Sequence, residues 1–258
     1  MNEILIPGSR SEKFEVTLIC FPHMGGNAYH YNTWTDILPT DVRVLTYQPP
    51  GRATRIRENP FYEIKSHVDH LLPHLSVVTE RPCLFFGHSF GAIVAFECLL
   101  ALRRNKFKLP NRIILSAAAP PSPNTLREAC WLRTQSDSEL FDQLVKMGGV
   151  PEQLLSYKDA FMPIMPTIRA ELWSLNDYRF DPHNHEPLSV PLSIFSGQDD
   201  QAVSPQSMAG WMEAFSGEKN QVIFPGDHFY TQTQSSLVSK KILDLILSDL
   251  ILLIKNRI

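Results

Sequence analysis

The stretch FFGHSFG at residues 85–91 decides the fold of this chain. It places the pattern Gly-x-Ser-x-Gly between a short apolar run, residues 81–86, and a segment in which apolar residues recur at helical spacing. A strand, a serine and a helix in this order present the hydroxyl of Ser89 as a nucleophile at the end of the strand. Only glycine is expected to fit at positions 87 and 91, because the tight turn brings both positions against neighbouring backbone, where a Cβ would clash. The alternative interpretation is an ordinary Gly-Ser turn.

A nucleophilic serine needs a histidine base and a carboxylate that orients the base, because its hydroxyl reacts poorly at neutral pH. Residues 191–196 form an apolar run that predicts a strand, and the turn GQDD follows it. Within this turn we predict Asp200 as the acid and Asp199 as its surface neighbour. A later apolar run is followed by PGDHFY, in which His228 is the predicted base. Aspartates in glycine-rich turns are also common as simple turn formers.

The oxyanion of an acyl-transfer reaction needs two backbone N–H donors. One is expected from Phe90, which follows the nucleophile. The other is expected from Met24, in the loop PHMGGN that follows a predicted strand at residues 17–21. A simple turn into the next helix is an equal alternative for the two glycines of this loop.

The chain has nine histidines, so several others are also candidates for the base. His67, His70 and His74 fall on one predicted helix, where the last two have the i,i+4 spacing of metal ligands. No glutamate completes an HExxH pattern, so a solvated helix face is the favoured interpretation. His88 is expected to pack beside the serine.

These motifs together resemble the type II thioesterases of polyketide, nonribosomal peptide and fatty acid synthesis, within the α/β-hydrolase superfamily. The resemblance covers residues 21–26, 50–55 and 87–91, the lid motifs at 147–151 and 168–171, and the histidine motif at 226–230. The family usually has a second glycine where this chain has Asp227. The resemblance implies a serine thioesterase that hydrolyses acyl thioesters on the phosphopantetheine arm of acyl or peptidyl carrier proteins. Such enzymes remove stalled or aberrant acyl units.

The expected fold is a three-layer α/β hydrolase, with a mostly parallel central sheet, helices on both faces and a helical lid. We expect one domain over residues 1–258, with the lid insertion at about residues 120–187, because the two flanking strands are separated by more than an ordinary connection. Met147, Phe161 and Met162 are the lid candidates for substrate binding. For any one of them, packing of the lid is the favoured alternative.

Composition limits the possible partners. The net charge of -3 leaves no electrostatic footprint for nucleic acid. Residues 241–258 are apolar but interrupted by charges, which favours a core-packed helix over a membrane span. The first ten residues lack a secretory signal pattern, so we expect a cytoplasmic protein. We also expect a monomer. The four cysteines lack CxxC spacing, and neither a metal nor a cofactor is expected.

Two further interpretations stay open. Arg52, Arg55 and Arg57 form a basic cluster that would suit an acidic carrier protein or the pantetheine phosphate, with a solvated loop as the alternative. The chain could also be a serine esterase for a free small-molecule ester, or, less favoured, a non-catalytic binding module with the same fold.

Overall fold

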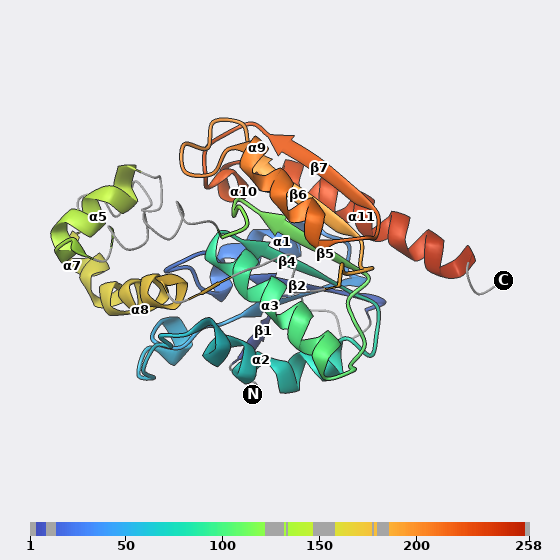
Figure 1. The fold of residues 1–258 in the computed structure, drawn as a ribbon, viewed down its shortest axis with the longest axis horizontal. Coiled ribbons are helices and arrows are strands. Elements are labelled where there is room, and N and C mark those ends of the chain that lie inside the picture. The colour runs from blue at the N-terminus through green and yellow to red at the C-terminus, as the bar shows by residue number, and fades with distance from the viewer. Residues whose placement is uncertain are drawn as a thin grey trace.

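The computed structural model describes residues 4–8, 14–121, 132, 134–146, 158–176, 178–179 and 186–255. Its centre is a seven-stranded sheet with the strand order β1-β3-β2-β4-β5-β6-β7 (Figure 1). All neighbouring strands pair in parallel except β1, which is antiparallel to β3. This sheet confirms the predicted mostly parallel fold. The strands are β1 (Leu5–Pro7), β2 (Val16–Phe21), β3 (Val42–Tyr47), β4 (Cys83–His88), β5 (Arg112–Ser116), β6 (Leu192–Gly197) and β7 (Lys219–Phe224).

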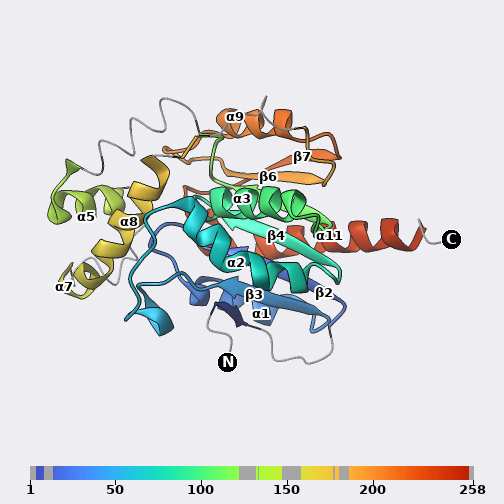
Figure 2. The same cartoon turned by 60° about the horizontal axis from the view of Figure 1, so that its bottom comes forward.

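Helices cover both faces of the sheet, because alternate residues of each strand point to opposite faces and both sets are apolar. Ile19 and Phe85 belong to a core under α2 (Ile64–Val78) and α3 (Phe90–Arg104). Leu18 and Phe86 belong to a second core under α1 (Asn32–Ile37) and α11 (Ser235–Lys255). Figure 2 shows these layers. The helices of the two layers are α1 (Asn32–Ile37), α2 (Ile64–Val78), α3 (Phe90–Arg104), α9 (Pro205–Met208), α10 (Tyr230–Thr233) and α11 (Ser235–Lys255).

In the described part of the chain between β5 and β6, three helices lie together at one end of the sheet (Figures 1 and 2). They are α5 (Asp137–Lys146), α7 (Lys158–Phe161) and α8 (Met165–Asn176), with a 3-10 turn at Met162–Ile164. Their apolar side chains form a third cluster of their own, which also contacts Met24. These helices fall within residues 120–187, and their role as a lid stays a prediction.

The C-terminal helix α11 packs on the sheet only in part. Val238, Ile242 and Ile246 are buried in the second core, and Asp249 forms a buried ion pair with Arg112 at 2.8 Å. Beyond this point the helix extends past the sheet and exposes apolar side chains, including Ile251 (Figure 1). The predicted core-packed helix is thus confirmed for its first half and wrong for its second. Among the described helices, none is long and apolar enough to cross a membrane.

The predicted solvated histidine face on α2 is wrong for His67. Its side chain is 1% exposed, and its Nδ1 shares a 2.9 Å hydrogen bond with the hydroxyl of Tyr47. The buried stripe of α2 falls at positions 64, 67, 68, 71 and 75, which is the spacing of a helix face turned to the core. His67 is one member of that stripe, and its ring lies edge-on to Phe61 and Phe90.

His67 should make the fold sensitive to acid. Burial lowers its pKa from 6.5 to about 3. Between these values the unfolded chain binds a proton that the folded chain does not, so stability falls as the pH drops below 6.5. For one such group the loss between pH 7 and pH 5 is about 2 kcal/mol. We expect His67→Phe, measured by denaturant unfolding at both pH values, to lose about 2 kcal/mol less than the wild type over this interval. Equal losses in the two proteins would contradict the assignment.

Candidate active site

Ser89 lies in a strained turn between β4 and α3. Its φ of 54° is in the left-handed region, which a side-chain-bearing residue rarely adopts. The flanking glycines make the turn possible, because a Cβ on Gly87 would lie 2.5 Å from the Cα of Ala92. A Cβ on Gly91 would lie 2.1 Å from the carbonyl oxygen of Phe21. The steric reason given for both glycines is confirmed.

The structure brings Ser89, Asp200 and His228 together. Nε2 of His228 lies 3.0 Å from Oγ of Ser89, and Nδ1 of His228 lies 2.8 Å from Oδ2 of Asp200. The three residues follow β4, β6 and β7, and the carboxyl ends of these parallel strands meet at one edge of the sheet. Both ring nitrogens of His228 are therefore engaged, one by a carboxylate and one by the serine hydroxyl.

The surroundings of Asp200 hold its carboxylate in place. Its Oδ1 accepts hydrogen bonds from the N–H groups of Ala202 and Val203 at 2.8 and 2.9 Å, which leaves Oδ2 for His228. The residue is 7% exposed, whereas its neighbour Asp199 is exposed. Asp199 takes part through its backbone, where its N–H donates to the carbonyl of Gly226 at 2.9 Å.

Two other histidines lie close to His228 but are held neutral. His88 packs beside the serine, as expected, and its Nδ1 lies 2.8 Å from Oγ of Ser116. Burial lowers the pKa of His88 well below 6.5, and nearby His228 lowers it further. Burial, then the neighbouring His30, lowers the pKa of His23 well below the same value. Both rings are uncharged near neutral pH, so neither adds a positive charge beside the base.

The two predicted oxyanion donors lie on different sides of the serine in the chain. Phe90 is the first residue of α3, so its N–H is at the positive end of the helix dipole. Met24 lies in the turn that follows β2. Within the described residues, neither N–H donates to another group, so both are available to bind an oxyanion.

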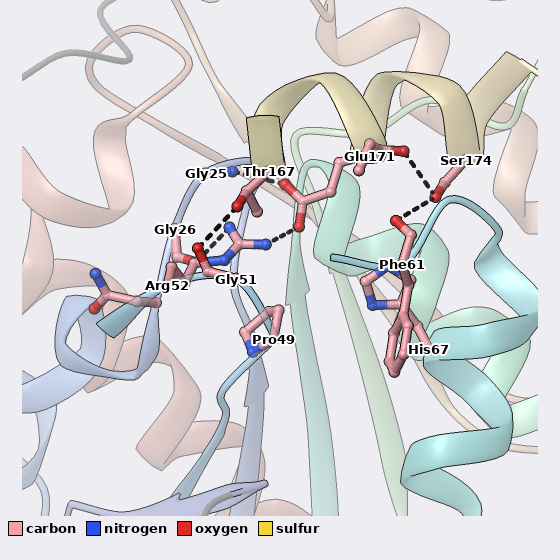
Figure 3. A network of polar contacts seen from close by, with 12 residues as sticks. Gly25, Gly26, Pro49, Gly51, Arg52, Phe61, His67, Thr167, Glu171 and Ser174 are labelled. Atoms are coloured by element: carbon pink, nitrogen blue, oxygen red, sulfur yellow. Dashed lines mark hydrogen bonds and ion pairs between the residues drawn. The ribbon is translucent and has the colours of Figure 1, made fainter. Parts of the chain in front are cut away.

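The predicted basic cluster is wrong in two of its three residues. Arg52 and Arg55 are only 2% and 3% exposed, and only Arg57 is exposed. Arg52 forms an ion pair with Glu171 of α8 (Figure 3), and Arg55 donates from Nε to Glu58 at 2.7 Å. The partner of Arg52 lies 119 residues away in the sequence, so a local charge pattern could not reveal it.

A cavity of about 120 Å3 opens beside Ser89 and has mainly apolar walls, among them Ile93, Leu175 and Val203. Tyr178 lines its wall and donates its hydroxyl proton to Glu97 at 2.8 Å. Burial raises the pKa of Tyr178 well above its usual value, which keeps this hydroxyl protonated.

Phe161 and Met162, two of the three lid candidates, are not among the described walls of this cavity. Phe161 packs against Phe141 with ring centroids 5.3 Å apart, and Met162 packs against the same helical cluster. These contacts agree with the alternative of lid packing. Met147 lies outside the described residues. Sequence reasoning also missed Tyr178, Leu175 and Val203, which carry no motif and reach the cavity only through the fold.

The comparisons with known proteins all point to the same family. The sequence profile of the thioesterase domain family matches residues 16–247. The gramicidin S biosynthesis protein GrsT of Aneurinibacillus migulanus is 26% identical, over 89% of this chain and 88% of that protein. The medium-chain S-acyl fatty acid synthase thioesterase of Homo sapiens is 32% identical, over 83% and 80%. The solved structure of the type II thioesterase BorB, from the borrelidin biosynthetic cluster, superimposes with a TM-score of 0.85 at 28% identity and covers 95% of this chain and 98% of its own.

Proposed function

The chain belongs to the thioesterase domain family, and we propose that it is an editing thioesterase that releases acyl groups from the phosphopantetheine arm of acyl or peptidyl carrier proteins. It is a hydrolase of thioester bonds. The observation that carries the proposal is the continuous hydrogen-bonded line from Asp200 through His228 to Ser89, beside an apolar cavity. The named relatives belong to gramicidin S biosynthesis, to fatty acid synthase and to the borrelidin biosynthetic cluster, and the carrier-bound substrate is inferred from them.

The mechanism follows from the contacts. Oγ of Ser89 attacks the thioester carbonyl while Nε2 of His228 takes the hydroxyl proton. Asp200 holds the imidazole by Nδ1 and stabilises its positive charge. The N–H groups of Met24 and Phe90 bind the oxyanion of the tetrahedral intermediate. His228 then protonates the leaving thiolate, and an acyl-enzyme ester on Ser89 remains.

Hydrolysis of this ester completes the cycle. His228 takes a proton from a water molecule, which attacks the ester carbonyl, and returns that proton to Oγ of Ser89 as the carboxylic acid leaves.

We also propose that α5, α7 and α8 form the lid of one catalytic domain. Leu175 of α8 lines the cavity, and α5 and α7 pack against α8 in one apolar cluster, which supports this, because a cover there would keep other water from the acyl-enzyme.

The proposal is tested with a panel of acyl groups, each presented both on a carrier protein and on a simple soluble thiol. We expect faster release from the carrier, and we expect the release to disappear in Ser89→Ala. Release that is equal or faster from free oxygen esters, with no advantage for the carrier, would instead identify a small-molecule serine esterase.

A further inference from the structure

A buried ion pair between Glu171 of α8 and Arg52 lies against the loop that contains Gly25 and Gly26 (Figure 3). We call residues 22–27 the oxyanion segment. One carboxylate oxygen of Glu171, Oε2, accepts the N–H of Gly25 at 2.8 Å, and the other, Oε1, pairs with the guanidinium of Arg52. Arg52 in turn donates from Nη1 to the carbonyl oxygen of Gly26 at 2.8 Å. The pair therefore holds the oxyanion segment at two backbone groups, one donor and one acceptor.

The pair is fully enclosed, with side chains that are 3% and 1% exposed. Burial raises the pKa of Glu171, and the charges and hydrogen bonds of Arg52 and Gly25 favour its ionised form. Removing two charges from water is costly, and a buried pair is often no more stabilising than apolar residues of the same size. A gain in stability is thus a weak explanation for this buried pair. Its contacts with the oxyanion segment suggest a role in holding that segment in place.

The contact falls one residue after Met24, which we propose as the second oxyanion donor. The peptide plane that holds the N–H of Gly25 begins at Cα of Met24. Fixing that plane therefore restrains Met24 at its Cα, and the N–H of Met24 lies in the preceding peptide plane, separated from it only by the φ and ψ rotations of Met24. Gly25 has a φ of 73°, and a Cβ there would lie 3.2 Å from Cγ1 of Ile168, also on α8. Helix α8 therefore rests on the oxyanion segment through both polar and apolar contacts.

We propose that Arg52 and Glu171 are positioning residues, which hold the N–H of Met24 toward Ser89. Oxyanion stabilisation then depends on whether α8 is packed against the oxyanion segment. The inference rests on the proposed function, because it concerns the same acyl transfer. Neither residue touches the reacting atoms: each acts through the backbone of the oxyanion segment.

The test uses two variants that differ in their effect on stability. Glu171→Gln leaves Arg52 buried without a counter-charge, which favours unfolding, whereas Arg52→Met/Glu171→Met replaces the pair with apolar side chains of similar length. We expect the double variant to fold and to lose kcat by about 10- to 100-fold with little change in KM, because a displaced donor stabilises only the oxyanion. The folded fraction of Glu171→Gln should show the same fall in kcat with little change in KM. Wild-type kcat in the folded double variant would overturn the proposal.

Thr167→Val is the matched control. Thr167 lies on the same helix, is buried, and donates to the carbonyl of Gly51 at 2.9 Å, and among the described residues its side chain has no hydrogen bond to the oxyanion segment. We expect this variant to keep its kcat. A loss of kcat as large as in the double variant would mean that anchoring α8 matters in general, and would overturn the specific role of the ion pair.

A transition-state analogue separates positioning from a general structural defect. An acyl trifluoromethyl ketone adds to Ser89 and places an oxyanion at the two N–H groups, whereas the carboxylic acid product does not. In the double variant we expect the inhibition constant of the ketone to rise by the same factor as kcat falls, and that of the acid to stay constant. Equal weakening of both would overturn the proposal.

The same assays run on a 4-nitrophenyl ester keep the two proposals distinct. If wild-type protein cleaves this ester through Ser89 but does not cleave acyl-carrier thioesters, the proposed function fails. The role of the ion pair would still be decided by the ester rates. If wild-type protein cleaves the thioesters and the double variant does so equally well, only the positioning role fails.

Discussion

Ser89→Ala is expected to reduce thioester hydrolysis by about 10⁴-fold or more, because loss of the nucleophile removes the covalent route altogether. The fold should be retained. Oγ of Ser89 contacts His228 at 3.0 Å, and the turn itself is held by backbone, where the N–H of Ser89 donates to the carbonyl of Ser116 at 2.8 Å. Product release under single-turnover conditions and denaturant unfolding, measured on the same preparation, check both parts.

His228→Ala is the companion variant, and the double variant is the informative control. Nucleophile and base act as one unit, so removing both should cost little more than removing either alone. A fluorophosphonate probe should label the wild type at Ser89 and should not label Ser89→Ala. Retention of more than about 1% of wild-type turnover in Ser89→Ala, where a loss of at least 10⁴-fold is expected, would contradict covalent catalysis.

The elbow could be predicted from sequence because its determinants are local. An apolar strand, two glycines and a helix within a few residues leave little choice of backbone, and Ser89 indeed has a φ of 54°. The convergence of Asp200 and His228 follows from one further rule. Each comes directly after a strand, and the carboxyl ends of neighbouring parallel strands meet at one edge of the sheet. The order of the motifs along the chain was therefore enough to predict that these side chains lie close together.

The environment of polar side chains could not be predicted in the same way. Arg52 looks exposed in a loop with two other arginines, and only the distant Glu171 explains its burial. His67 looks polar on a helix, but the positions around it on the helix face are apolar, and Tyr47 supplies its partner. In both cases the deciding contact comes from another element, so single-sequence patterns carry no signal for it.

The choice between two adjacent aspartates gives the last prediction. Asp200 is buried, contacts His228 at 2.8 Å, and accepts two backbone N–H groups, whereas Asp199 is exposed. An amide at position 200 presents either its oxygen or its NH₂ group to Nδ1 of His228, but it cannot supply the negative charge that favours the imidazolium.

Asp200→Asn is therefore expected to lower kcat by about 10³- to 10⁴-fold near neutral pH, because the base loses both its correct tautomer and the stabilisation of its charged form. Asp199→Asn, which makes the same chemical change one residue earlier, should alter kcat by less than about threefold, as expected for a surface substitution. Steady-state rates and unfolding midpoints of the two variants, compared side by side, measure the difference. The reverse order of effects would assign the acid to Asp199, and similar losses in both would indicate that the turn after β6, rather than one carboxylate, supports His228.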